Sequence, residues 1–282
     1  MNDALIVSLL SVIPKNRTAR LMGAGTRVRL PAFAHRALVR WFVRKYGVNL
    51  DECQGGIDDF PTLAQFFIRE LKPGMRPIDP DPGAMVSPVD GRTHTFGAVR
   101  DGQFVQSEGR MGSVARLLGE GSADVGLDPR RFEGGSFAII YLSPKDYHRV
   151  HSPVDGELVG MRYAPGQLWP VFPAATRKID GLFDRNERLN FHLQTEHGAV
   201  VLAMIGAVGV GRMSTPHAPL ITNTGGALED LRPGIQIARG QELGRFEMGS
   251  TVVILAEPGR LSWALTPGEV VRLGRPIARF GG

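Results

Sequence analysis

The residue types of an oriented serine nucleophile occur at three widely separated places in this chain. Asp90 lies in Ser-Pro-Val-Asp-Gly, His148 and His151 lie in Asp-Tyr-His-Arg-Val-His, and Ser250 lies in Met-Gly-Ser-Thr. In such a set, a histidine takes the hydroxyl proton of the serine, and a carboxylate fixes the tautomer of that histidine. The order of these residue types differs between unrelated folds, so the spacing found here is compatible with this chemistry.

The Gly249–Ser250 step indicates a less common use of the serine. It leads directly into the apolar run 251–255, which has the composition of a buried strand. Gly249 places no side chain on the acyl side of the peptide bond and permits unusual backbone torsions. The hydroxyl of Ser250 could therefore attack the carbonyl of Gly249. We expect the chain to be a precursor whose cofactor is made from Ser250 itself.

Other functions fit parts of this pattern. An Asp-His-Ser hydrolase would use the same side chains without self-cleavage. A non-enzymatic, membrane-docked barrel protein would use the Gly-Ser step as a simple turn. A metal site at His148, His151 and Asp90 is conceivable, but no further pair of ligands is spaced for one, so we expect no metal. The single cysteine, Cys53, excludes an internal disulfide.

Positive charge is concentrated at the N-terminus. Residues 1–46 contain nine lysines and arginines against one acid, Asp3, which gives a net charge of +8. The whole chain has a formal charge of +5, so the remainder carries −3. A basic arm on a slightly acidic body predicts an anionic partner for the arm. The arm has no named nucleic-acid-binding motif, so we expect a membrane surface and no nucleic acid.

The elements of this arm suit a membrane surface. The apolar segment 4–13 is too short to cross a bilayer as a helix, which takes about 20 residues. Residues 33–46 have helical spacing, with an arginine stripe (Arg36, Arg40, Arg44) and an apolar face (Ala34, Ala37, Leu38, Trp41, Phe42). This pattern favours a helix that lies in the interface of an anionic membrane. The alternative is a helix packed on the core with its arginines in solvent.

Beyond the arm, the composition predicts a mainly β protein. Residues 62–71 and 113–118 have the spacing of short helices, and the proline-rich segment 77–83 cannot be helical. Short apolar runs bounded by Gly, Pro and Asp then predict strands, at 137–142, 158–163, 199–205 and 252–255. We expect an α+β, mainly β architecture with two parts, a helical, basic, membrane-docking region (1–75) and a β-rich catalytic domain (76–282).

Two internal echoes refine the expected β architecture. Ser-Pro-Val-Asp-Gly occurs at 87–91 and again at 152–156, and residues 233–246 resemble residues 267–280. Each copy of the longer echo has the pattern turn, strand, glycine turn, strand. Repeated hairpins of this kind are typical of the barrel-sandwich folds of biotinyl and lipoyl carriers, so we expect a barrel-sandwich-like β core. The carrier lysine is missing, so the echo bears on fold and not on carrier function.

Together these motifs resemble those of the prokaryotic, pyruvoyl-dependent phosphatidylserine decarboxylases. The resemblance rests on four stretches and spans nearly the whole chain: Thr62–Pro82 with Phe-Phe-Ile-Arg-Glu-Leu-Lys-Pro-Gly-x-Arg-Pro-Ile-Asp, Ser-Pro-Val-Asp-Gly at 87–91, Tyr-Leu-Ser-Pro-Lys-Asp-Tyr-His-Arg-Val-His-Ser-Pro at 141–153, and Phe-Glu-Met-Gly-Ser-Thr-Val-Val at 246–253. The combination of Asp-Tyr-His-Arg-x-His with Gly-Ser-Thr is highly specific. The chain departs from the family at Glu108, where a lysine is common, so no headgroup contact is expected there.

The resemblance implies two reactions. In the first, His151, oriented by Asp90, deprotonates Ser250, and the chain separates into residues 1–249 and 250–282, the latter capped by a pyruvoyl group. In the second, the pyruvoyl carbonyl forms a Schiff base with phosphatidylserine, CO2 leaves, and His148 donates a proton, which gives phosphatidylethanolamine. The resemblance further implies a peripheral protein on the cytoplasmic side of the cell membrane, which meets phosphatidylserine in an anionic bilayer. The two chains stay associated, and the processed heterodimer forms a homo-oligomer.

Overall fold

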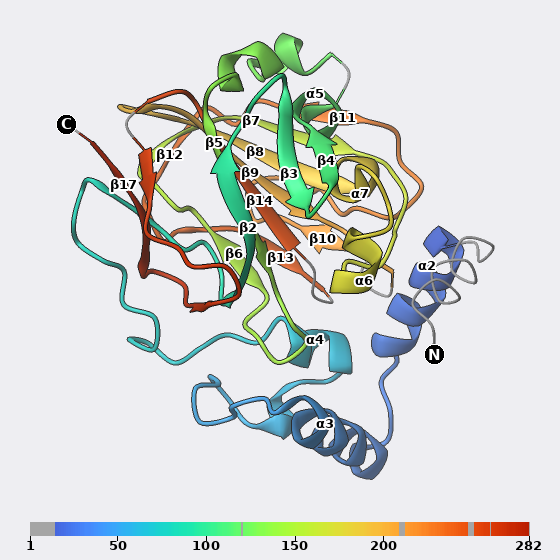
Figure 1. Ribbon diagram of the computed structural model, residues 1–282. Coiled ribbons are helices and arrows are strands. Elements are labelled where there is room, and N and C mark those ends of the chain that lie inside the picture. The colour runs from blue at the N-terminus through green and yellow to red at the C-terminus, as the bar shows by residue number, and fades with distance from the viewer. Residues whose placement is uncertain (1–14, 120, 209–211, 248–250, 260, 282) are drawn as a thin grey trace.

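The computed structural model describes residues 15–281, apart from 120, 209–211, 248–250 and 260 (Figure 1). The apolar segment expected at 4–13 thus lies outside the described residues. The α-helices are α2 (Lys15–Thr26), α3 (Ala32–Tyr46), α4 (Leu63–Phe67), α5 (Val114–Leu118), α6 (Pro173–Thr176) and α7 (Leu182–Arg185). The 3₁₀ helices are η1 (Ile57–Asp59), η2 (Ser122–Val125) and η3 (Pro129–Phe132).

Strands begin at residue 84 and make up most of the remaining regular structure. They are β1 (Ala84–Val86), β2 (Gly91–Ala98), β3 (Gln103–Ser107), β4 (Arg110–Ser113), β5 (Ser136–Tyr141), β6 (Arg149–His151), β7 (Gly156–Ala164), β8 (Arg188–Thr195), β9 (Gly198–Ile205), β10 (Met213–Ser214), β11 (Glu229–Leu231), β12 (Ile235–Ile237), β13 (Glu242–Phe246), β14 (Thr251–Ala256), β15 (Leu261–Trp263), β16 (Val270–Val271) and β17 (Pro276–Phe280). The strands predicted from the four apolar runs are confirmed as β5, β7, β9 and β14.

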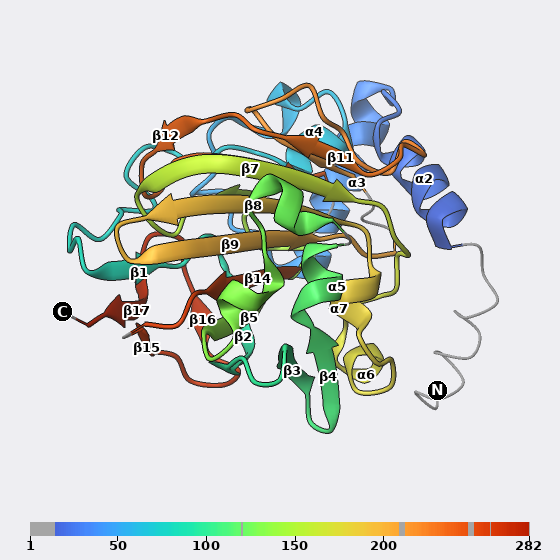
Figure 2. The same cartoon turned by 90° about the horizontal axis from the view of Figure 1, so that it is seen from above.

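The largest sheet is antiparallel and has the order β11-β7-β8-β9-β14-β5-β2-β16, with β12 also paired to β7. Figure 2 shows β7, β8, β9 and β14 side by side in this sheet. Two smaller sheets have the orders β1-β17-β15 and β10-β13-β6, and β3 pairs with β4. The prediction of a mainly β protein with helices in its N-terminal part is therefore confirmed.

The strand that follows Ser250 lies at the centre of the largest sheet. Strand β14 pairs with β5 on one side and with β9 on the other, and all six of its residues are buried. Val252 and Ile254 pack in one apolar cluster, and Val253 and Leu255 pack in another. Burial on both faces explains why the run is continuously apolar instead of alternating.

Helix α3 confirms the helix predicted at 33–46. It has apolar side chains both on the side that packs against α4 and on its exposed side. Val39 and Phe42 pack with Phe66 and Phe67 of α4. On the other side of the helix, Phe33 and Trp41 are 78% and 47% exposed. The helix is thus a core helix on one side and exposes apolar side chains on the other.

Helix α4 begins as predicted but is shorter than the predicted helix at 62–71. The hydroxyl of Thr62 accepts a hydrogen bond from Gln65 N at 3.2 Å, which caps the first turn. The helix ends at Phe67, and Leu71 forms a β-bridge with Cys53 instead of continuing the helix. This tertiary pairing overrides the helical spacing. The helix predicted at 113–118 is confirmed as α5, whereas α2 was not predicted.

The strands of the two sequence echoes pair with one another. The first Ser-Pro-Val-Asp-Gly joins β1 to β2, and these strands pair with β17 and β16. The second joins β6 to β7, which pair with β13 and β12 in the same arrangement. Each copy of the longer echo therefore supplies one strand to the largest sheet and one to a small sheet. The expectation that each copy of the longer echo forms its own hairpin is wrong. Its two strands pair with the strands on either side of a Ser-Pro-Val-Asp-Gly turn, and not with each other.

The described helices contain no candidate for a membrane-spanning segment, since none combines enough length with enough apolar character.

Candidate functional site

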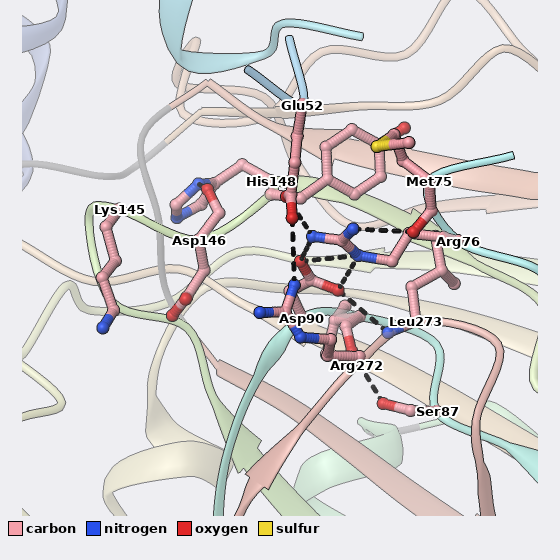
Figure 3. Close-up of polar contacts among 12 residues, drawn as sticks. Glu52, Met75, Arg76, Ser87, Asp90, Lys145, Asp146, His148, Arg272 and Leu273 are labelled. Atoms are coloured by element: carbon pink, nitrogen blue, oxygen red, sulfur yellow. Dashed lines mark hydrogen bonds and ion pairs between the residues drawn. The ribbon is translucent and has the colours of Figure 1, made fainter. Parts of the chain in front are cut away.

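Asp90 is held at the end of the first Ser-Pro-Val-Asp-Gly turn by three groups of donors. Its carboxylate accepts hydrogen bonds from Arg76 Nε at 2.8 and 3.0 Å and from Arg76 Nη2 at 2.5 Å. The backbone N–H of Leu273 donates to Asp90 Oδ1 at 2.9 Å. Figure 3 shows the carboxylate enclosed by these partners. A buried carboxylate with this many donors is held in one position.

Arg76 also connects Asp90 to a second carboxylate. Its Nη2 lies 2.6 Å from Glu52 Oε2, and this hydrogen bond lowers the pKa of Glu52 (Figure 3). The side chain of Arg76 is almost fully buried. Arg76, Glu52 and Asp90 line a cavity of about 160 Å³, together with Asp146 and Tyr147 from the loop before β6.

His151 lies at the end of β6, with both ring nitrogens facing defined partners. Nδ1 lies 2.8 Å from the carbonyl oxygen of Gly240, and Nε2 lies 3.3 Å from the hydroxyl of Tyr147. The hydrogen-bond partner that orients the ring is thus a backbone carbonyl, whereas the resemblance implied Asp90. Burial lowers the pKa of His151, and the negative charges of Glu242 and Asp90 oppose this effect. A neutral ring with Nδ1–H donated to Gly240 leaves Nε2 as a base.

His148 is fully buried on the aromatic ring of Phe67. The two ring centroids are 4.0 Å apart, and His148 Nδ1 lies 2.8 Å from the carbonyl oxygen of Asp146. The Asp146 carboxylate accepts from the N–H and hydroxyl of Ser143, which closes the turn that presents the histidine. His148 Nε2 is buried and has no partner among the described residues. Burial lowers the pKa of His148 to about 3.

Gly249 and Ser250 lie outside the described residues, but the strands on either side of them are described. Before them, the N–H of Phe246 donates to the carbonyl oxygen of His148 at 2.9 Å. After them, Thr251 opens β14 between Tyr141 and Ile205, and its hydroxyl is buried without a described partner. Two buried polar atoms, His148 Nε2 and Thr251 Oγ1, thus have no partner among the described residues and lie on segments close in sequence or by hydrogen bonding to the predicted cofactor residue. Buried polar atoms normally have hydrogen-bond partners, so a polar group made from residue 250 would fit beside them.

Comparison with known proteins assigns the chain to a family. The family model described as phosphatidylserine decarboxylase matches residues 63–279. The chain belongs to the phosphatidylserine decarboxylase family. Relatives named phosphatidylserine decarboxylase proenzyme occur in Anaeromyxobacter sp. (strain K), at 45% identity, and in Myxococcus xanthus, at 41%; each alignment covers 98% of this chain and 99% of the relative. A relative of that name in Shewanella amazonensis is 37% identical over 99% of both chains.

The match to phosphatidylserine decarboxylases covers the predicted site residues and leaves the first 62 residues outside it. Asp90, His148, His151 and Ser250 all fall within the matched range. In the part of the chain that is described, no three His, Cys, Asp or Glu side chains are grouped to hold a metal ion.

Two arginines of this site were not predicted from the sequence. Arg76 holds Asp90, and the buried Arg69 donates from Nη2 to the carbonyl oxygen of Lys145 at 2.8 Å, in the loop that carries His148. Both arginines lie in the segment Ile-Arg-Glu-Leu-Lys-Pro-Gly-Met-Arg, which is part of the family resemblance. Nothing in their spacing shows that they reach partners 14 and 76 residues away.

The segment around Glu108 has a structural role at its buried positions. Glu108 itself is exposed. The amide of Gln106 donates to the carbonyl oxygens of Thr176 and Ile179 at 2.8 Å, and its oxygen accepts from Leu182 N at 2.6 Å. Gln106 therefore fixes the loop between α6 and α7.

Proposed function

We propose that this protein decarboxylates phosphatidylserine with a pyruvoyl group, which it makes by cutting its own chain between Gly249 and Ser250. Similarity to proenzymes over nearly the full length supports the reaction. The structural observation that carries the proposal is the position of His148. Its backbone is hydrogen-bonded to Phe246, four residues before Ser250, and its buried Nε2 has no partner among the described residues and can meet a reacting group.

His151 is the proposed base of the self-cleavage. It takes the hydroxyl proton of Ser250 while the serine oxygen attacks the carbonyl carbon of Gly249. The C–N bond of that peptide then breaks, so that an ester joins the two parts of the chain. Removal of the α-proton of residue 250 expels the carboxylate of Gly249, and hydrolysis of the resulting enamine releases ammonia and leaves the pyruvoyl group.

The surroundings of His151 support this role. Burial keeps the ring neutral, and its hydrogen bond to Gly240 directs the unprotonated nitrogen away from the backbone. Asp90 is proposed to stabilise the protonated ring through its charge, since that charge raises the pKa of the buried histidine. General-base assistance of this kind contributes about 10²–10⁴-fold.

His148 is the proposed proton donor of the second reaction. The pyruvoyl group would supply the electron sink for the loss of CO2. Because burial lowers its pKa to about 3, His148 is neutral at pH 7 and must gain a proton before it can donate one. A substrate carboxylate close to Nε2 would favour the charged ring and raise that pKa.

The N-terminal helices are proposed to dock the protein on the membrane. Phe33 and Leu21 are 78% and 74% exposed, and both lie on the strongly basic part of the chain. Exposed apolar side chains beside arginines suit a peripheral position on an anionic bilayer. We therefore assign residues 1–75 to membrane docking, on the cytoplasmic side of the cell membrane, and residues 76–282 to catalysis.

After cleavage, chains 1–249 and 250–282 are proposed to stay associated and to form a homo-oligomer. Strand β14 supports the association, because its pairing with β5 and β9 is extensive and its residues are buried.

Intact-mass measurement of the purified protein tests the proposal. We expect two chains and a pyruvoyl-blocked N-terminus on the smaller one, whereas Ser250→Ala should remain a single chain close to 30.6 kDa and lack decarboxylase activity. A wild-type protein that stays intact after long incubation, or an active Ser250→Ala variant, would refute it. His148→Ala should still cleave but should lose decarboxylation, which separates the roles of the two histidines.

A further inference from the structure

A second, more open pocket lies between the N-terminal helices and the strand that leads to Ser250. It has a volume of about 290 Å³ and is lined by Arg27 and Arg29 from the α2–α3 connection, by Gln65 and Ile68 from α4 and its end, and by Glu247. Figure 1 shows α2, α3 and α4 on the same side of the sheets. We call it the Arg27–Arg29 pocket. It is separate from the Asp90 cavity, since no residue lines both.

The charges of this pocket leave one cation available. Glu247 is held by Arg212 at 2.8 Å and faces Arg27 at 3.5 Å, so its negative charge is already compensated. Arg29 has no hydrogen bond or ion pair with any residue that the structure describes. A guanidinium group has a fork of donors that matches the oxygens of a phosphate or carboxylate. The pocket therefore offers a free anion-binding group beside a compensated ion pair.

The neighbours of the pocket link it to both the proposed reaction and the proposed membrane face. Glu247 precedes Ser250 by three residues, so the covalent chain limits the distance between their Cα atoms to about 11 Å. The carbonyl oxygen of Ile68 accepts from Arg149 Nε at 3.0 Å, and Arg149 follows His148 directly. On the other side, the chain around Arg29 exposes Val28, at 53%, and Leu30.

We propose that the Arg27–Arg29 pocket binds the phosphodiester of the phospholipid headgroup, with Arg29 as the main contact. This assignment rests on the proposed decarboxylation. It places the phosphate between apolar side chains suited to acyl chains and the segment that contains Ser250. The charges also match, because Arg29 supplies an uncompensated positive charge for the phosphate, whereas Arg27 already faces Glu247. The absence of a lysine at position 108 then removes no phosphate contact.

The phosphodiester does not change during loss of CO2, so this contact acts equally on substrate and transition state. Such uniform binding affects KM and leaves kcat unchanged. This is the property that separates a binding role of Arg29 from a role in the chemistry.

The test uses the complete, processed enzyme and a short-chain phosphatidylserine below its micelle-forming concentration, so that attraction to a bilayer does not contribute. Arg29→Gln should raise KM roughly tenfold with little change in kcat, as expected for loss of one hydrogen bond to a charged group. Arg29→Lys keeps the charge but loses the fork of donors, so its KM should lie between those of the wild-type enzyme and Arg29→Gln. Arg100→Gln is the matched control, because Arg100 is an exposed arginine outside both the pocket and the N-terminal region.

Each outcome decides the assignment. A KM for Arg29→Gln within twofold of wild type would overturn it, and so would equal increases in Arg29→Gln and Arg100→Gln, which would indicate a general effect of charge. Inorganic phosphate should compete only weakly with the short-chain phosphatidylserine. If phosphate bound as tightly as this substrate, the pocket would be reassigned to free phosphate. Failure of the decarboxylase proposal itself is distinguishable, because the wild-type chain would then neither cleave nor release CO2.

Discussion

The two Ser-Pro-Val-Asp-Gly turns have the same backbone design and different surroundings. In each turn the serine hydroxyl donates to a carbonyl two residues later, Ser87 to Val89 at 2.7 Å and Ser152 to Val154 at 2.6 Å. In each, the aspartate accepts one backbone N–H at 2.9 Å, Asp90 from Leu273 and Asp155 from Arg239. The turns also bind each other, through Val86 N to the Pro153 oxygen and His151 N to the Pro88 oxygen.

The aspartates differ in what lies beyond the turn. Asp90 is buried against Arg76, whereas the side chain of Asp155 is 67% exposed and lies 3.9 Å from Arg239 Nε. His151 occupies the place in the second repeat that Val86 occupies in the first. The pentapeptide therefore builds a scaffold, and burial together with an arginine partner makes one copy a candidate for chemistry.

Neutralising the two aspartates should produce the largest difference. Asp90→Asn keeps the shape of the side chain but removes the charge that stabilises a protonated His151, so we expect self-cleavage to slow by about 10²-fold. Asp155→Asn should change the rate by less than about twofold, because its exposed charge is screened by solvent. The processed fraction over time, read on a denaturing gel, measures both. Equal rates in the two variants would remove the functional distinction between the turns.

Removing the two arginines should separate the turns by stability. Arg76→Met leaves the buried Asp90 and the half-buried Glu52 without their shared cation, and we expect a loss of about 3 kcal/mol in the free energy of unfolding. Arg239→Met leaves only the exposed Asp155 and backbone carbonyls, so about 1 kcal/mol is expected. Urea unfolding in an uncleaved Ser250→Ala background gives both values. Similar losses would show that burial of Asp90 adds nothing beyond the common turn.

The smallest effect concerns the scaffold itself. Ser87→Ala and Ser152→Ala each remove one buried hydrogen bond within a turn, so each should cost about 1 kcal/mol. The same urea experiment measures the two variants. We expect equal losses, because the geometry of the two bonds is nearly identical. A clear inequality would show that the two turns do not share one structural role.

Much of the candidate site could be predicted because its residues lie in short, specific motifs. Asp90, His148 and His151 fall within the matched family region. Asp90 and His148 lie outside regular helices and strands, so their motifs identified them and not a periodic pattern. The length of α4 could not be predicted, because a bridge between Leu71 and Cys53 stops the helix. The orientation of His151 could not be predicted either, because its partner Gly240 lies 89 residues away in the chain.

The amino-acid sequence by itself determined the chemistry available to this protein: a Gly-Ser step, two histidines, an aspartate and a basic N-terminal arm. It also determined the strand periodicity and the repeated turns, since these depend on neighbouring residues. The tertiary structure sets which aspartate of the two identical pentapeptides is buried and which arginine pairs with Asp90. It also decided which arginine stays free in the Arg27–Arg29 pocket. Burial and ion pairing depend on residues far apart in the chain, and local pattern carries no information about them.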